Sequence, residues 1–525
     1  MGRWVSSFIA AVFVSFIFLS GGIGLAKGTS QEVHITILHT NDMHSRIKAG
    51  DDAGKSMGMA EIAAAVKAER AKNPNVLLMD AGDTLHGMPV INISHGENMV
   101  RLLNLTGYDC MAPGNHDYNY GAEQLENLSK QLNFPILSAN TVDKRTGKLI
   151  FPAYKTMVVD GVKIAVFGLT TPETAYKTSP ENVRNIEFLD PIACAQTMVK
   201  QLRADHDVLI AVTHLGIDLQ SAVTSDKLAA AVPGIDVIID GHSHTELPQG
   251  LKVGKTLIAQ TGCYDHNLGV VHLTVRNHQL VQAQAQLYSA AEVNKIVPEA
   301  DPAVSQAIQQ IEQDNQPVFA EVVVHNDGEA LSDERQVLRC QETALGNLLT
   351  DAFRYETQSD VAIMNSGGIR SGIPAGDVTR GDVMAILPFG DTVRKVEVTG
   401  NVLRQVLEHS VSAYPAPAGS FLQVSGVDFT FDPSQKPGQR LTSVNVGGQA
   451  LDPLGKYTVT INDFLAAGGD GYTMLQDARE IGEYGTCEEL FMAYLQKQGV
   501  DLSNPGRIHV AAETDASKPE LQEAA

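Results

Sequence analysis

Apolar runs of strand length alternate with helical patterns over the first half of the chain. The run VHITIL at 33–38 precedes an amphipathic stretch, GMAEIAAAVKAERAKN at 58–73, which leads into the apolar run VLLM. VLIAVT at 208–213 and IDVIID at 235–240 repeat the theme. Because these runs are apolar throughout and are separated by helices, they predict an α/β domain whose sheet is covered on both faces.

A turn signal inside this region predicts that the sheet is mixed. The segment YKTMVVDGVKIAVFGL at 154–169 contains two strand-like runs joined by Asp160 and Gly161. Asp-Gly pairs are typical of tight hairpin turns, so these two strands are expected to be antiparallel.

The chain has 525 residues, which favours two domains, and a helical segment divides it. In DPAVSQAIQQIEQ, Pro302 stands near a helix start, and Val304, Ile308 and Ile311 recur at helical spacing. We therefore expect a first domain over 32–298, an interdomain helix over 299–321, a second α/β domain over 322–511 and a disordered polar tail over 512–525.

The first 26 residues have the features of a secretory signal peptide. Arg3 precedes an apolar run from Val5 to Leu19, and the triplet GLA at 24–26 resembles a cleavage site. The run is shorter than the roughly 20 residues that cross a bilayer, which disfavours the alternative of a retained membrane anchor. We expect cleavage after residue 26 and a periplasmic or extracellular protein.

The net charge of −22 argues against nucleic-acid polymers and anionic membrane surfaces as partners, because both require basic patches. Small anionic partners are not excluded, since bound metal ions reverse the local field. The five cysteines lack the short spacing of a metal site. They are either small buried apolar residues or partly paired, and their odd number leaves at least one outside any intramolecular pair. Oligomeric state stays open.

Polar residues cluster just beyond the carboxyl ends of the predicted strands. Ligands bind at this edge in open α/β sheets, so distant segments can converge there. The residues concerned are Asp42 and His44, Asp83, His214, and His242 and His244. Asp42 and His44, like His242 and His244, are spaced i, i+2, which in extended chain places both side chains on one face. Each pair is therefore expected to serve one cluster.

With Asn115 from APGNHDYNYG, this inventory holds two carboxylates, one amide and four imidazoles. Mixed oxygen and nitrogen ligands without thiolates suit hard or borderline divalent metals. Seven ligands exceed the need of one tetrahedral ion. They suit two ions that share a bridging carboxylate, an arrangement that clamps the attacking and departing oxygens in phosphate ester hydrolysis.

The motifs, taken in order, resemble those of the secreted bifunctional metallophosphatase/5′-nucleotidase family. HTNDMHSRI, DAGDTLHG, GNHDYNYG, THLG and GHSH are similar to its calcineurin-like phosphoesterase domain. LGNLLTDAF, NSGGIRSGIPAGDVT, LPFGDTV, FLQVSG and NDFLAAGGDGY are similar to its C-terminal nucleotide-recognition domain. The resemblance covers nearly all of the chain after residue 26. It implies an enzyme that hydrolyses small nucleotides, with two divalent ions drawn from Zn, Mn, Co, Mg and Ca.

Carried over by position, the resemblance implies two metal sites that share Asp83. One consists of Asp42, His44, Asp83 and His244, and the other of Asp83, Asn115, His214 and His242. A water held by the metals would attack phosphorus in line, and His116 would stabilise or protonate the departing oxygen.

In the second domain, the resemblance implies a nucleobase held between Phe421 and Phe464, because every base has a π face that stacks on aromatic rings. It also implies that Asn365, Arg370 and Asp470 hold base, ribose or phosphate. The alternative for the two phenylalanines is an ordinary place in the core.

Two positions depart from the family pattern. Asn119 stands where many relatives carry an aspartate that orients the catalytic histidine, and an amide stabilises imidazolium less than a carboxylate does. Gln341 lies near the place of a substrate-binding arginine in several relatives.

The leading hypothesis is release of phosphate from nucleoside 5′-monophosphates, with di- and triphosphates and UDP-sugars as further candidates. A 2′,3′-cyclic-nucleotide phosphodiesterase with 3′-nucleotidase activity is the enzymatic alternative, which Asn119 keeps open because some such relatives share it. An exported nucleotide-binding protein without catalysis is the third. The complete set of metal ligands argues against this third hypothesis, because a site that no longer catalyses a reaction is free to lose its ligands.

Overall fold

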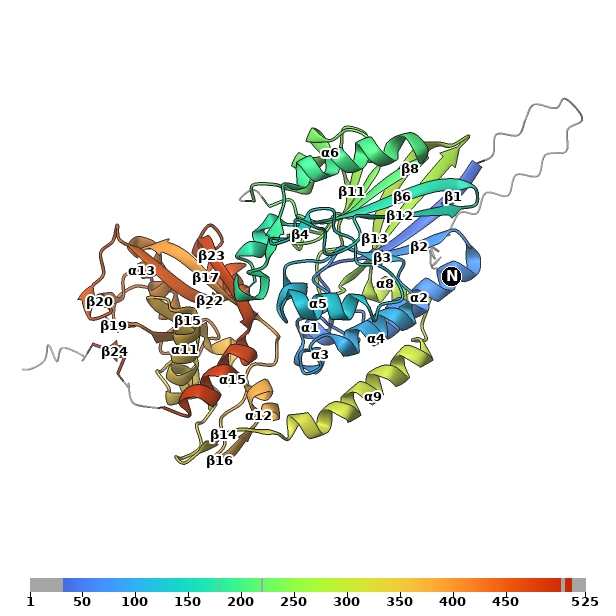
Figure 1. Ribbon diagram of the computed structural model, residues 1–525. Coiled ribbons are helices and arrows are strands. Elements are labelled where there is room, and N and C mark those ends of the chain that lie inside the picture. The colour runs from blue at the N-terminus through green and yellow to red at the C-terminus, as the bar shows by residue number, and fades with distance from the viewer. Residues whose placement is uncertain (1–31, 179, 219–220, 502–505, 512–525) are drawn as a thin grey trace, which may run out of the picture.

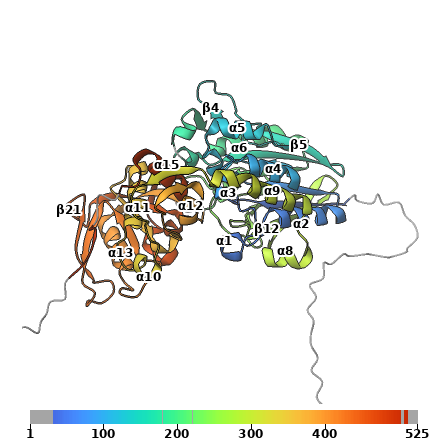
Figure 2. The same ribbon diagram turned by 90° about the horizontal axis from the view of Figure 1, so that it is seen from below.

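The computed structural model describes residues 32–178, 180–218, 221–501 and 506–511. It shows two α/β lobes joined by one long helix, with the earlier part of the chain in one lobe and the later part in the other (Figures 1 and 2). The predicted signal peptide over 1–26 and the predicted disordered tail over 512–525 lie outside the described residues. The α/β class predicted from the apolar runs is confirmed.

The N-terminal lobe contains two facing mixed sheets. The first has the strand order β13 (Gln279–Ser289), β12 (Asn267–Arg276), β1 (Glu32–Thr40), β2 (Val76–Asp80), β3 (Cys110–Met111). The second has the order β10 (Leu251–Val253), β11 (Thr256–Ala259), β9 (Val237–Ile239), β8 (Val208–His214), β6 (Val162–Thr170), β5 (Tyr154–Val159). β5 and β6 form the predicted antiparallel hairpin, with Asp160 in a left-handed conformation at its turn.

Apolar side chains from both sheets form the core between them, including Ile37 of β1 and Ile210 of β8, both fully buried. This two-sided burial explains why the central strands are apolar throughout. The outer faces are covered by helices α2 (Met59–Lys72), α4 (Glu97–Thr106), α5 (Ala122–Ser129) and α8 (Ala290–Ile296) on the first sheet, and by α6 (Pro191–Leu202) and α7 (Ser225–Ala231) on the second. Short pieces complete the lobe: α1 (Asp51–Gly54), α3 (Pro89–Asn92), β4 (Thr141–Asp143) and β7 (Ile186–Phe188).

Helix α9 (Pro302–Phe319) connects the lobes. Asp301 caps it by accepting hydrogen bonds from the backbone N–H groups of Ala303 and Val304, a type of cap that contributes about 1 kcal/mol. Its apolar stripe, which includes Val304 and Ile311, joins the core of α2 and α4. The helix therefore belongs to the N-terminal lobe for most of its length and contacts the second lobe through α12 (Arg380–Ile386).

The C-terminal lobe is built on a five-stranded mixed sheet of order β18 (Leu422–Ser425), β15 (Val361–Asn365), β22 (Lys456–Asn462), β17 (Thr392–Thr399), β23 (Arg479–Thr486). Helices α11 (Ala344–Thr357), α12 and α15 (Cys487–Gln498) cover one face, and α13 (Gly400–Ser410) covers the other. A second sheet packs beside α13, with the order β21 (Gln449–Ala450), β20 (Leu441–Val446), β19 (Val427–Phe431), β24 (Ile508–Val510). The remaining pieces are β14 (Val322–Asn326), β16 (Gly376–Thr379), α10 (Arg335–Leu338) and α14 (Asp463–Ala466).

All five cysteines fall within the described residues, and none forms a disulfide there. Among the helices of the described ranges, none is long and apolar enough to cross a membrane.

Candidate active site

The strand ends of the two N-terminal sheets meet at one edge, as the sequence predicts. Asp83 follows β2 of the first sheet, and His214 is the last residue of β8 in the second, yet the Asp83 Oδ2 and His214 Nε2 atoms lie 3.0 Å apart. Asp42 follows β1, and its Oδ1 lies 3.5 Å from Nε2 of His244. Both carboxylates are buried.

These side chains form two adjacent groups whose ligand atoms are close enough to hold a metal ion, and a third group, His44, Asp83 and His116, overlaps both. One group is Asp42, His44 and His244, and the other is Asp83, His214 and His242. The predicted extended geometry of the i, i+2 pairs is wrong, because Asp42, His44, His242 and His244 all have positive φ angles. Left-handed residues break the alternation of a strand, and His242 and His244 point into different groups. Asp42 and His44 still belong to one group, as expected.

The loops that carry these groups are held by Asp117, which follows His116 in the chain. Its carboxylate accepts backbone N–H bonds from Asp83, Thr84, Leu85 and Gly114 at 2.8–3.0 Å. Gly114 is required at its place, since a Cβ atom there would lie 2.1 Å from Oδ1 of Asp83. The GNHD motif thus organises the DAGD loop as well as presenting its own polar side chains.

Two buried ligand-type atoms in this cluster make no well-directed hydrogen bond among the described residues: Oδ1 of Asn115, and Nε2 of His214, which faces the Asp83 carboxylate at 3.0 Å. The other polar atom of each side chain is used. Asn115 Nδ2 donates to the carbonyl of Lys177 at 2.8 Å, and His214 Nδ1 lies 2.6 Å from the carbonyl of Ala81. A histidine that donates its Nδ1 proton to a carbonyl presents the Nε2 lone pair, which is the arrangement of a metal ligand. The donor set therefore fits divalent ions.

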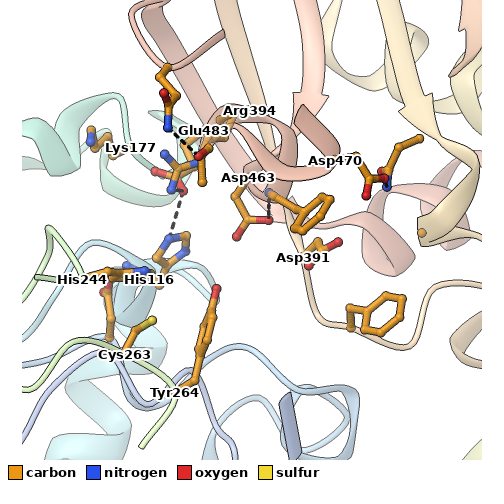
Figure 3. Close-up of a pocket in the computed structure, with 18 of the residues that line it drawn as sticks. His116, Lys177, His244, Cys263, Tyr264, Asp391, Arg394, Asp463, Asp470 and Glu483 are labelled. Atoms are coloured by element: carbon orange, nitrogen blue, oxygen red, sulfur yellow. Dashed lines mark hydrogen bonds and ion pairs between the residues drawn. The ribbon is translucent and has the colours of Figure 1, made fainter. Parts of the chain in front are cut away.

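His116 contacts both lobes. Its backbone N–H donates to Asp83 Oδ1 at 2.8 Å, while its Nε2 lies 3.0 Å from Oε1 of Glu483 on β23. Burial lowers the pKa of His116, but the charges of Glu483 and Asp83 outweigh burial and raise it to about 8. Figure 3 shows Glu483 reaching from the C-terminal lobe to this ring. The imidazole nitrogen of His116 that faces the other lobe is therefore in contact with the Glu483 carboxylate.

Between the lobes lies a cavity of about 1100 Å³. On the N-terminal side it is lined by Asp83, Asn115, His116, His242 and His244, together with Arg46, Lys177, Cys263 and Tyr264. On the C-terminal side the wall includes Asn365, Arg370, Phe389, Arg394, Phe464 and Asp470. The cavity thus joins the predicted metal cluster to four of the five residues predicted to bind substrate.

Phe421 is the exception, because it does not line the cavity in this arrangement of the lobes. It is 2% exposed and packs in the core beside β18 and α13, whereas Phe464 is 42% exposed and lines the cavity. Phe389 is the second exposed phenylalanine of this wall, at 43%. The burial of Phe421 favours the alternative weighed for any phenylalanine, a place in the core.

The polar residues of the C-terminal wall are linked to one another. Asn365 donates to Asp470 Oδ2 at 2.9 Å, and the guanidinium of Arg370 lies 5.7 Å from the centre of the Phe389 ring. Gln341 is exposed and lies outside the cavity, but Arg339, two residues earlier, lines it. A cation is thus present near the position where Gln341 departs from the family pattern.

The residues that sequence reasoning missed are Phe389, Glu483, Arg394, Lys177 and Arg46. Phe389 lies inside the quoted motif LPFGDTV, which gave a usable signal. Arg46 likewise lies inside the quoted motif HTNDMHSRI, whereas Glu483, Arg394 and Lys177 lie in none of the quoted motifs. Arg46 donates from its guanidinium to the carbonyl of Phe389 at 2.9 Å, and Arg394 lies 3.3 Å from Glu483. Such contacts depend on how the lobes are placed.

Comparisons with known proteins identify the two lobes separately. Residues 35–246 match the calcineurin-like phosphoesterase family, and residues 322–477 match the 5′-nucleotidase C-terminal domain. The chain is 32% identical over 501 residues to the 5′-nucleotidase of Homo sapiens, with 84% of each protein covered. It is 31% identical to the trifunctional nucleotide phosphoesterase protein of Bacillus subtilis, covering 89% of this chain but only 34% of that longer protein.

A solved structure supports the same assignment. The 5′-nucleotidase precursor of Thermus thermophilus matches with 30% identity and a TM-score of 0.56, covering 92% of this chain and all of that one. The matches extend over both lobes and the helix between them. The chain therefore belongs to the 5′-nucleotidase family of metal-dependent phosphoester hydrolases.

Proposed function

We propose that the protein is an exported two-metal phosphohydrolase that releases phosphate from nucleoside 5′-monophosphates. The supporting observation is the single cavity that runs from the aspartate and histidine cluster to two exposed phenylalanines of the other lobe. A nucleotide has the same two ends, an anionic phosphate and a flat base. Nucleoside di- and triphosphates and UDP-sugars are further substrates compatible with a cavity of this volume.

Asp42, His44, Asp83 and His244 would hold one ion, and Asp83, Asn115, His214 and His242 the other. Support comes from the adjacent ligand groups, from the unpartnered Asn115 Oδ1 atom and from His214 Nε2, which faces the Asp83 carboxylate. When bound, two divalent ions lower the pKa of a water molecule and neutralise charge on phosphoryl oxygens.

His116 would act on the departing oxygen. This role is supported by the Nε2 atom of His116, which faces a carboxylate oxygen of Glu483 and so has room for an anionic oxygen. A substrate oxygen at the same place would receive a hydrogen bond or a proton from the ring. Glu483 would have to give way to the substrate oxygen at this place.

The base would lie between Phe389 and Phe464, with Asn365, Arg370 and Asp470 beside it. Both rings are about two-fifths exposed and line the same cavity, as a stacking site requires. Phe389 replaces the buried Phe421 in this role.

A phosphate-release panel tests the proposal with AMP, ATP, UDP-glucose, 3′-AMP and 2′,3′-cyclic AMP, with and without chelator. Wild type is compared with Asp83→Ala and with Asp205→Ala, which changes an exposed carboxylate elsewhere in the N-terminal lobe. We expect chelator-sensitive release from AMP, lost only in Asp83→Ala. Chelator-insensitive turnover or full activity in Asp83→Ala would contradict the two-metal proposal.

The same panel separates the alternatives. Preferential hydrolysis of 2′,3′-cyclic AMP and 3′-AMP would identify the phosphodiesterase alternative. No turnover in any metal-supplied reaction, with AMP still bound, would identify a nucleotide-binding protein. Export rests on the pattern of residues 1–26, and N-terminal sequencing of the protein secreted by its source cells tests it. A chain that begins at Met1 would contradict cleavage.

A further inference from the structure

A second buried histidine lies parallel to His116. His86, from the motif DAGDTLHG, is completely buried, and its ring centre lies 6.1 Å from that of His116 with 9° between the ring planes. His86 does not line the cavity and belongs to neither ligand group. Neither the predicted metal clusters nor the proposed reaction uses it.

One amide connects the two rings. Asn119 Nδ2 lies 3.1 Å from Nδ1 of His86 and 3.1 Å from Nδ1 of His116. The amide is itself held, because its Oδ1 accepts a hydrogen bond from the Thr178 hydroxyl at 2.8 Å. The backbone carbonyl of Asn119 accepts another from Asn182 at 2.8 Å. Asn119 is therefore fixed in a position where it serves both imidazoles at once.

The C-terminal lobe places one carboxylate on each ring. Glu483 Oε1 lies 3.0 Å from Nε2 of His116, and Glu489 Oε2 lies 3.1 Å from Nε2 of His86. Glu489 is held by the first turn of α15, where it accepts the backbone N–H of Thr486 at 3.0 Å. Each histidine thus contacts Asn119 through Nδ1 and a glutamate of the C-terminal lobe through Nε2.

These partners determine which nitrogen of each neutral ring carries the proton. A carboxylate only accepts, so each Nε2 must donate to its glutamate. Each neutral Nδ1 then presents a lone pair, which accepts a hydrogen bond from the Asn119 amide. An aspartate at position 119 would favour the opposite tautomer, with the proton on Nδ1. Asn119 therefore leaves His116 with a donor at Nε2 even when the ring is neutral.

We propose that His86 is a positioning residue for His116, acting through the shared amide of Asn119. Removal of its Nδ1 acceptor leaves one amide proton without a partner in a buried site, so the amide can turn and His116 loses its fixed orientation. Because Glu489 reaches His86 only from the C-terminal lobe, the placement of that lobe also fixes the amide. The inference rests on the proposed role of His116.

A matched pair of variants tests the proposal. His86→Asn carries an amide oxygen near the place of Nδ1 and keeps the acceptor for Asn119, whereas His86→Gln keeps only a donor near the place of Nε2 for Glu489. We expect kcat for AMP to fall about tenfold in His86→Gln with KM nearly unchanged, and to be largely retained in His86→Asn. His34→Gln, on the exposed end of β1, is the control. Equal losses in both His86 variants would overturn the proposal.

A second readout does not need activity. ¹⁵N NMR of histidine-labelled, metal-free protein, at a pH where the His116 ring is neutral, reports which ring nitrogen holds the proton. We expect the Nε2–H form of His116 in wild type and His86→Asn, and a mixture of tautomers in His86→Gln. An unchanged His116 spectrum in folded His86→Gln would overturn the proposal. If wild type releases no phosphate, the proposed function fails, while this spectrum still decides the role of His86.

Discussion

The two walls of the cavity differ in how their functional residues are positioned. On the N-terminal wall, every candidate ligand lies at the end of a buried strand or in the loop that follows it, and Asp117 holds two of these loops together through four backbone hydrogen bonds. On the C-terminal wall, Glu483 and Phe389 reach the site because one lobe lies against the other. The positions of the functional residues on the first wall are set by the fold of one domain. Those on the second wall depend on how the two domains are arranged.

The strongest expected effect concerns the N-terminal wall. Chelation should reduce phosphate release from AMP by about a thousandfold or more, because the metals supply both water activation and charge neutralisation. Re-addition of a divalent ion should restore activity, as a colorimetric phosphate assay will show. Retention of most activity after exhaustive dialysis against chelator would show that metals held by the N-terminal wall are not needed for hydrolysis.

The contrast between the walls explains what the sequence predicts and what it does not. The edge rule for α/β sheets brought Asp83 and His214 together correctly although 131 residues separate them. The i, i+2 argument failed locally, because it assumed extended chain where Asp42 and His242 adopt left-handed conformations. A motif does not report which way a ring points, so the burial of Phe421 could not be predicted. Glu483 lies in none of the quoted motifs, and its contact with His116 depends on how the two lobes are placed.

The two phenylalanines distinguish a core position from a cavity position. Phe421→Ala should lower the free energy of unfolding by about 3 to 5 kcal/mol, because it empties a buried site. Phe389→Ala should change it by less than about 0.5 kcal/mol but raise KM for AMP about tenfold, through lost stacking. Denaturant unfolding and steady-state kinetics measure the two effects. If Phe421→Ala raised KM without loss of stability, Phe421 would be the residue that contacts the base and its assignment to the core would be wrong.

The ion pair between the walls should make stability depend on pH in metal-free protein. His116 has a pKa of about 8, raised from 6.5, so its contribution of about 2 kcal/mol is present below pH 6.5 and is lost as pH rises through about 8. Denaturant unfolding over this range, with Glu483→Gln as the comparison, measures it. Identical pH profiles for both proteins would show that the pair contributes nothing.

A smaller effect is expected when the carboxylate that covers His116 is neutralised. Glu483→Gln should lower KM for AMP about threefold, because a neutral amide competes less than a carboxylate for the place of an anionic substrate. Initial-rate kinetics with saturating metal will measure it, and Glu480→Gln on the same strand is the matched control. A higher KM in Glu483→Gln alone would mean that this carboxylate helps to bind substrate.

A crystal structure with a divalent metal and a non-hydrolysable analogue of AMP tests the central claim most directly, because it shows whether both walls act on one nucleotide. We predict two ions bridged by Asp83, the phosphate beside His116 in place of Glu483, and the base between Phe389 and Phe464. A single ion, or a base bound away from these two rings, would contradict the account.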